Sequence, residues 1–447
     1  MDNTANSRQE ALFNGIAVQN NGSANKLDFS DQPVHNWYRF ILSFPPHLVR
    51  HYIERFGLTK DSVVLDPFCG TGTTIVEAKK MGIRGIGVEA NPVAHLASSV
   101  KTDWNIDQDA FRNCCAAIGK SALAEMAAQG ISDTIGSNNT AVSTAALRTL
   151  APQAADLLLG DSISPLPLHK CLVLLDHIKN FEGRSFFRHA LLAFAKTAVL
   201  HASNLHFGPE VGVTRTKKAD VWLVPSWLSE IGTCARDIRG LQGLKDTPSI
   251  VYLADARRLN NLLPPLSVDA VFTSPPYPNE KDYTRTTRLE NVLLGHIQNK
   301  GELRALKKSL LRSNTRGVYK GDDDDRWISG NREIEEIAGS IENRRLALGK
   351  TSGFERMYAR VTKLYFGGMA RHLADLRSVL KPGAMLGYVV GDQASYLRVT
   401  IQTGRLLTDI AQSLGYQPVS VDLFRTRIAT ATKIYMREEV VVLRWPG

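Results

Sequence analysis

Hydrophobic positions first form a clear pattern at residues 63–65, where an unbroken apolar run predicts a buried parallel strand. A turn containing Gly70 and Gly72 follows, and helical spacing of apolar residues then extends to about residue 81. A second apolar strand is predicted at residues 85–88. This order of strand, glycine turn, helix and strand is typical of an α/β protein with a parallel sheet.

The same pattern resumes in the second half of the chain. Further strands are predicted at residues 249–253, 268–273, 385–390, 419–424 and 439–444. Helices are predicted at residues 46–56, 373–380 and 401–414, the second of them ended by Lys381, Pro382 and Gly383. The last two strands suggest an antiparallel pair. The fold class is therefore α/β, with a sheet assembled from both halves of the chain.

Two long stretches interrupt the α/β pattern. The first has helical composition, and the second is polar and basic. We therefore divide the chain into a flexible N-terminal tail (1–32), three core segments (33–104, 248–283 and 366–447), a helical insertion (105–247) and a basic insertion (284–365).

The composition is that of a globular protein, since 43% of the 447 residues are hydrophobic and 22% are charged. No apolar run approaches the roughly 20 residues that span a bilayer. The first residues lack a secretory pattern, so we expect a cytoplasmic protein that does not enter a membrane. The five cysteines show no Cys-x-x-Cys spacing, which indicates neither a disulfide framework nor a zinc site. The net charge of +10 favours a polyanionic partner.

Acidic residues stand where the predicted strands end. Asp66 follows the first strand, Glu89 the second and Asp255 the third. In an open parallel sheet these ends form the ligand-binding edge. Glu89 is placed to accept hydrogen bonds from ribose hydroxyls. Asp255 is placed either to accept one from an adenine amino group or to cap a helix.

The fourth strand runs directly into Ser274, Pro275, Pro276 and Tyr277. Two prolines do not continue a central strand, so they predict a rigid turn at the same edge of the sheet. The glycine turn is not of the phosphate-binding type. Ile75 stands where the third glycine of Gly-x-Gly-x-x-Gly would be, and no Gly-Lys-Ser/Thr run follows.

These two motifs together resemble a known family. Phe-Cys-Gly-Thr-Gly at residues 68–72 and Thr-Ser-Pro-Pro-Tyr at residues 273–277 are similar to motifs of the DNA amino-methyltransferases. That family uses Asp-Pro-Pro-Tyr or Asn-Pro-Pro-Tyr mainly for adenine and Ser-Pro-Pro-Tyr mainly for cytosine. The resemblance is closest to the branch that methylates the N4 amine of cytosine.

The resemblance implies a Rossmann-like methyltransferase sheet, S-adenosyl-L-methionine as the methyl donor, and double-stranded DNA with a flipped base as the substrate. It implies that Ser274 and Pro275 accept hydrogen bonds from the target amine, while Pro276 shapes the turn and Tyr277 stacks on the base. The implied cofactor-binding residues are Phe44, Asp66, Pro67, Phe68, Gly70, Gly72, Thr73, Thr74, Glu89 and Asp255. A cognate restriction nuclease is a further implied partner.

Other functions remain open at this point. They are methylation of the N6 amine of adenine, methylation of RNA, and binding of nucleic acid without catalysis. Covalent methylation at carbon 5 of cytosine is disfavoured, because no cysteine here follows a proline. The Glu-Asn-Val sequence at residues 290–292 echoes a motif of those enzymes, and we interpret it as coincidence.

Both insertions contain candidate DNA contacts. In the first, a Gly-Pro loop at residues 208–209 is flanked by Arg215, Lys217 and Lys218, with His206 and Glu210 as polar contacts; a plain turn with a solvated basic edge is the alternative. In the second, aromatic residues alternate with many basic ones. Its acidic run at residues 322–325 suggests a solvated loop. Either insertion is a candidate for reading the DNA sequence.

Overall fold

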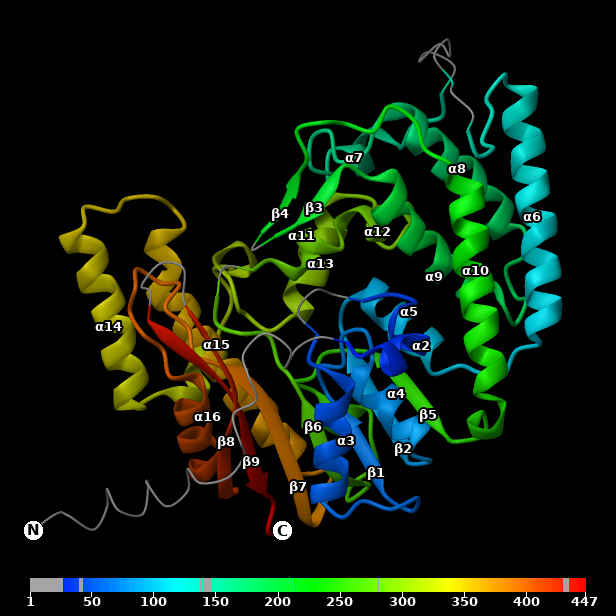
Figure 1. Ribbon diagram of the computed structural model, residues 1–447. Helices are drawn as coiled ribbons and strands as arrows, with labels where there is room; N and C mark the ends of the chain where they lie inside the picture. The colour runs from blue at the N-terminus through cyan, green and yellow to red at the C-terminus, as the bar shows by residue number, and fades with distance from the viewer. Residues whose placement is uncertain are drawn as a thin grey trace, which may run out of the picture.

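A seven-stranded sheet forms the centre of the computed structural model, which describes residues 27–39, 43–136, 139, 147–208, 210–279, 281–428 and 434–447. The strand order is β5-β2-β1-β6-β7-β9-β8 (Figure 1). The strands are β1 (Val63–Asp66), β2 (Arg84–Glu89), β5 (Ser249–Leu253), β6 (Val268–Thr273), β7 (Leu380–Gly391), β8 (Gln417–Ile428) and β9 (Tyr435–Arg444).

Strand directions follow the predicted pattern. β5, β2, β1, β6 and β7 are parallel to one another, whereas β9 runs antiparallel to both β7 and β8. The predicted antiparallel pair at the C-terminus is thus confirmed. So is the α/β class with a Rossmann-like methyltransferase sheet.

One predicted helix boundary is wrong. The pattern at residues 373–380 predicts a helix, but α15 (Tyr358–Leu376) ends earlier and Leu380 begins β7. The pairing of β6 with β7 explains how Pro382 is tolerated. Val268 is paired with Leu380, but Ala270 is paired with Met385, so the extra residues of β7 bulge out at this irregularity.

Helices cover both faces of the sheet. On one face, α3 (Pro46–Arg55) packs Tyr52 against Phe272 of β6, with ring centroids 5.0 Å apart. On the other face, α15 and α16 (Thr403–Ser413) pack in a second apolar cluster. The helices that follow β1 and β2 are α4 (Thr73–Lys80) and α5 (Pro92–Lys101). The predictions for residues 46–56, for the helix after the glycine turn and for residues 401–414 are confirmed to within a few residues.

The first insertion is mostly helical, as predicted. Its elements are α6 (Gln108–Ala128), α7 (Pro152–Ala155), α8 (Pro165–Lys179), α9 (Phe187–Thr197), η3 (Ala198–Ala202), β3 (Leu205–Phe207), β4 (Val211–Val213), α10 (Leu223–Gly240) and η4 (Gln242–Leu244). The small β3–β4 hairpin was not predicted. Its turn falls at the Gly-Pro loop, of which Pro209 lies outside the described residues.

The second insertion consists mainly of helices, and Figure 1 shows the longest of them, α14, beside α15. The elements between β5 and α15 are η5 (Leu259–Asn261), α11 (Tyr283–Thr286), α12 (Arg288–Leu293), α13 (Lys300–Ser309), η6 (Thr315–Gly317), η7 (Asp324–Ile328), α14 (Arg332–Ala347) and η8 (Glu355–Met357). The interpretation of residues 322–325 as a solvated loop is wrong. Asp324 is buried and bonded to Arg257 and Arg371.

Most of the predicted N-terminal tail, residues 1–26, lies outside the described residues. The end of this segment is part of the fold, in η1 (Phe29–Asp31) and α2 (Gln32–His35). Asp31 is buried and accepts a hydrogen bond of 2.8 Å from Nη1 of Arg50. Within the described ranges, no helix combines the length and apolar character needed to cross a membrane.

Candidate active site

A cavity of about 670 Å³ opens at the carboxyl ends of β1 and β6. The chain passes from β1 to β2 and β5 on one side, then crosses to β6 and β7 on the other. The adjacent ends of β1 and β6 are therefore the point where the strand order reverses, which is the usual ligand site of such sheets. The volume of the cavity is in the range of cofactor and small-molecule sites.

The two glycines of the first turn differ in their surroundings. Gly70 has φ of +51°, lines the cavity, and would place an added Cβ more than 4 Å from any neighbour. Gly72 has φ of +87° at the start of α4, and an added Cβ would approach Cβ of Ser98 to 2.9 Å. Gly70 therefore keeps the cavity open, and Gly72 allows the turn to pack against α5.

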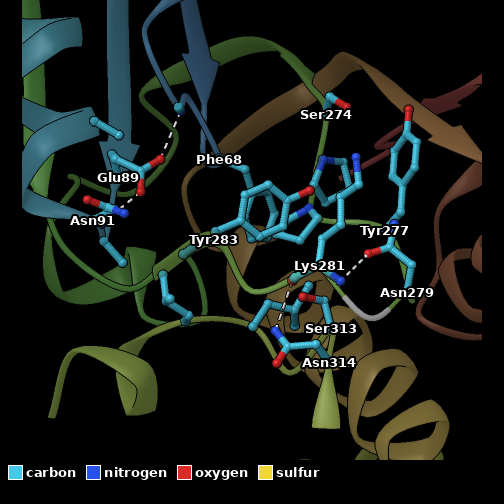
Figure 2. Close-up of a pocket in the computed structure, with 18 of the residues that line it drawn as sticks. Phe68, Glu89, Asn91, Ser274, Tyr277, Asn279, Lys281, Tyr283, Ser313 and Asn314 are labelled. Carbon is cyan, nitrogen blue, oxygen red and sulfur yellow. Dashed lines mark hydrogen bonds between the residues drawn. The ribbon is translucent and has the colours of Figure 1, made fainter. Parts of the chain in front are cut away.

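Glu89 lines the cavity at the end of β2. Its Oε2 accepts a hydrogen bond of 2.9 Å from the Gly70 N–H, and its Oε1 accepts one of 2.7 Å from the Asn91 N–H (Figure 2). Burial raises the pKa of Glu89 to about 7, although these two backbone bonds lower it. Each oxygen retains a lone pair with which to accept another donor.

Asp255 lines the same cavity just beyond β5. Its Oδ2 accepts a 2.7 Å hydrogen bond from Nη2 of Arg257, and its Oδ1 accepts a 2.9 Å bond from the Arg257 N–H. Arg257 is buried and also donates to Asp324 in the second insertion. No α-helix begins at Asp255, so the expected helix cap is replaced by a turn fixed by an arginine.

The Ser-Pro-Pro-Tyr turn leaves β6 beside the glycine turn, and all four of its residues line the cavity. The Ser274 hydroxyl donates a 3.1 Å hydrogen bond to the Val389 carbonyl on β7. This bond uses the hydroxyl proton and leaves the oxygen lone pairs as acceptors. The Tyr277 ring packs against the backbone of Gly391, where there is no side chain. An added Cβ at Gly391 would lie 3.0 Å from Cε2 of Tyr277.

Three of the predicted site residues, Asp66, Gly72 and Thr74, do not line the cavity, whereas Phe44, Pro67, Phe68 and Thr73 do. Asp66 is fully buried and accepts hydrogen bonds from Thr273 Oγ1 (2.6 Å) and the Phe68 N–H (3.2 Å). Burial raises its pKa to about 6. Asp66 therefore ties the end of β6 to the glycine turn.

Several residues of the cavity were not among the predicted cofactor-binding and catalytic residues. Figure 2 shows Tyr283 facing the same space as Phe68 and Tyr277, and burial raises the pKa of Tyr283 to about 12. Lys281 is held there by its carbonyl, which accepts a 3.0 Å hydrogen bond from Asn314 Nδ2. The sequence signal for Tyr283 is its place among basic residues just after the Ser-Pro-Pro-Tyr turn, a pattern that fits nucleic-acid contact.

The candidates in the first insertion separate into two groups. Glu210 lines the cavity, but His206 does not. Lys217 and Lys218 also lie outside its lining, and their ammonium groups donate to the backbone carbonyls of Thr214 and His201. Lys217 therefore stabilises its own loop, and Lys218 joins that loop to η3.

The structure does not support the alternative of covalent catalysis at carbon 5 of cytosine. Glu290 is buried away from the cavity lining and accepts a hydrogen bond from the Tyr38 hydroxyl. Cys69 does line the cavity, but burial raises the pKa of its thiol, so it remains protonated at neutral pH. Residues 290–292, which echo a motif of the carbon-5 methyltransferases, are thus part of the packed helix α12.

Comparisons with known proteins find similarity to DNA methyltransferases. A family model for N6/N4 methyltransferases, described as DNA methylase, matches residues 12–99. The chain is 26% identical to the type II methyltransferase M.BsoBI of Geobacillus stearothermophilus, over 93% of this chain and 84% of that one. It is 30% identical to M.AvaI of a Nostoc species over 33% of this chain.

Other matches are shorter or weaker. The type II methyltransferase M.MjaII of Methanocaldococcus jannaschii is 37% identical over 15% of this chain. The matches cover 30% of M.AvaI and 13% of M.MjaII. Among solved structures, TrmN of Thermus thermophilus matches 90% of this chain and 48% of its own, with 11% identity and a TM-score of 0.27.

Proposed function

We propose that the protein is an S-adenosylmethionine-dependent DNA amino-methyltransferase that methylates the N4 amine of cytosine at a specific DNA sequence. The observation that carries this proposal is the Ser274 hydroxyl, which donates to Val389 and so faces the cavity as an acceptor. The serine at this position supports cytosine over adenine through the family resemblance.

The cavity suits the cofactor of this family. The open side of Gly70 leaves room for it, and the free lone pairs of Glu89 match a pair of ribose hydroxyls. We propose that Phe44 and Phe68 supply apolar contacts and that Asp255, fixed by Arg257, accepts a hydrogen bond from the adenine amine. When bound there, S-adenosylmethionine supplies an electrophilic methyl group on its sulfonium.

The residues of the turn would prepare the target amine. The lone pair of that amine is delocalised into the base ring, which makes it a poor nucleophile. Hydrogen bonds accepted by the Ser274 hydroxyl and the Pro275 carbonyl would draw the amine toward tetrahedral geometry and fix its direction. Stacking on the Tyr277 ring would hold a base that has left the duplex. Catalysis would then rest on positioning, without a protein nucleophile.

Both insertions contribute to the cavity, which supports a role for each in holding DNA. Glu210 comes from the first insertion, and lining residues between Thr284 and Gly317, among them Lys307 and Asn314, come from the second. Relatives of the chain are named type II methyltransferases. We therefore propose that the methylation protects DNA from a cognate restriction nuclease.

Nucleoside mass spectrometry of DNA treated with the purified protein and S-adenosylmethionine tests this function. We expect N4-methylcytosine, and finding only N6-methyladenine would contradict the choice of base. We expect Ser274→Ala to lower kcat by about 10²- to 10³-fold, because a positioned hydrogen bond to the reacting group is lost. Ser378→Ala is the matched control, since its hydroxyl also donates to a backbone carbonyl but lies outside the cavity lining.

A further inference from the structure

The two insertions meet through charged side chains at the rim of the cavity. Glu210, in the β3–β4 turn, places its Oε2 3.7 Å from Nη1 of Arg285 and 3.6 Å from Nη1 of Arg316. Arg285 lies on α11 and Arg316 in η6, so both guanidinium groups belong to the second insertion. Distances of this length are ion pairs but are too long for hydrogen bonds.

These two arginines have donors that the rest of the described structure leaves unused. Nε of Arg285 and Nη1 of Arg316 are buried atoms without a hydrogen-bond partner among the described residues. Arg312, nearby, instead forms 2.9 Å bonds from both Nε and Nη2 to Asp322. Buried guanidinium donors are normally bonded, and a two-oxygen anion is their best partner. Glu210 alone does not fill this role.

The position of the two arginines does not depend on Glu210. Asp282 caps α11, which carries Arg285, and accepts a 2.9 Å bond from Nζ of Lys307. The same Nζ donates a 3.2 Å bond to the carbonyl of Arg316. The Arg316 guanidinium also lies over the Phe354 ring, 5.3 Å from its centroid. One framework therefore holds both groups.

Further positive charge gathers around Glu210. Lys281 and Arg427 line the same cavity, from the segment after the Ser-Pro-Pro-Tyr turn and from β8. Burial lowers the pKa of Lys281, the charge of Arg427 lowers it further, and Glu210 raises it. Glu210 thus lies among cations at the entrance to the site that the target base would enter.

We propose that Arg285 and Arg316 form a binding site for a phosphate of the DNA strand carrying the target base, and that Glu210 occupies this site until DNA displaces it. The two non-bridging oxygens of a phosphodiester would satisfy both guanidinium groups, which one loosely held carboxylate does not. Displacement would also break these two ion pairs between the insertions at the moment of binding. This inference rests on the proposed function, because it requires DNA as the substrate.

Opposite effects of substitutions at the two sides of this contact test the inference. The dissociation constant of the full-length protein for a short duplex oligonucleotide is measured by fluorescence anisotropy at several salt concentrations. We expect Glu210→Gln to bind DNA at least several-fold more tightly, because the competing carboxylate charge is removed. We expect Arg285→Gln and Arg316→Gln each to bind more weakly, with a log–log salt slope shallower by about 1.

Glu182→Gln is the matched control, since Glu182 is an exposed carboxylate of the same insertion outside the cavity lining, and we expect it to bind like the unsubstituted protein. If Glu210 only ties the insertions together, all three test variants will bind DNA equally well or change in the same direction, and the inference is wrong. In that case the unsubstituted protein still binds and methylates DNA. If that protein does neither, the proposed function fails as well.

Discussion

At the scale of single residues, the site depends on acids whose neighbours decide their charge. Glu89 and Asp66 are both shifted upward in pKa by burial, but only Glu89 lines the cavity. Backbone N–H groups of Gly70 and Asn91 hold the Glu89 carboxylate in place. We therefore expect the affinity for the cofactor to depend directly on the ionisation of Glu89.

Cofactor affinity is predicted to fall as the pH drops below about 7. In the free protein the pKa of Glu89 is raised to about 7, so the carboxyl is increasingly protonated below that value. Bonds from ribose hydroxyls favour the charged form, so binding releases a proton and is strongest above pH 7. The dissociation constant of S-adenosylhomocysteine, measured by calorimetry from pH 5.5 to 8.5, checks this.

The same titration separates Glu89 from other groups. Glu89→Gln should weaken binding by about 1.5–3 kcal/mol at pH 8 and flatten the pH dependence below pH 7. Glu54→Gln, an exposed carboxylate on α3, should leave both unchanged. A pH dependence that survives in Glu89→Gln would assign the proton to a different residue.

At the scale of elements, the end of β5 is joined to the second insertion by buried charges. Asp255 is held by Arg257, which also contacts Asp324 at the start of η7, and Asp324 contacts Arg371 on α15. Removing one carboxylate from this chain leaves a buried guanidinium partly unpaired. The insertion therefore helps to fix an acid of the proposed cofactor site.

Asp324→Asn is accordingly predicted to lower the free energy of unfolding by about 1.5–3 kcal/mol. It should also weaken S-adenosylhomocysteine binding, because Asp255 loses its fixed neighbour. Asp323→Asn is an adjacent control, since the Asp323 side chain is 59% exposed and should change stability by less than about 0.5 kcal/mol. Urea unfolding and calorimetry measure the two effects. Equal effects of the two substitutions would mean that the buried contacts contribute nothing.

The sequence predicted those elements that are determined by residues close together in the chain. Apolar runs placed β1, β2, β5 and β6 within a residue or two, and the motifs around Gly70 and Ser274 placed one part of the cavity wall. Features that depend on distant partners were missed. Asp324 is buried because Arg257, 67 positions earlier, needs a counter-charge. The start of β7 depends on an irregular pairing with β6 that no local pattern indicates.

The same reason explains which site residues were missed. Lys281 and Arg427 reach the cavity because the chain after β6 and the last strand pair fold back over the sheet edge. The pairing of Glu210 with Arg285 joins two insertions that are far apart in the chain. Such contacts follow from tertiary packing, so composition could indicate only that both segments are polar.

At the scale of the whole molecule, the first insertion shares its core with the rest of the chain. One apolar cluster contains Trp37 of the N-terminal segment, Val93 and Leu96 of α5, and residues of α6, α8, α9 and α10. Asp237 of α10 accepts hydrogen bonds on Oδ2 from Trp37 Nε1 (2.8 Å) and from the Val34 N–H (3.0 Å). Although the insertion has the length of a subdomain, its core is therefore continuous with that of α5 and the N-terminal segment.

This continuity predicts that the insertion and the methyltransferase core unfold together. Asp237→Ala leaves two buried donors unpaired, at a cost of about 1–3 kcal/mol each, and should lower the midpoint of a single transition. Arg236→Ala, on the exposed side of the same helix, should leave that midpoint nearly unchanged. Urea unfolding followed by tryptophan fluorescence and by far-ultraviolet circular dichroism measures both variants. Non-coincident transitions, with only the earlier one shifted in Asp237→Ala, would show instead that the insertion folds as an independent unit.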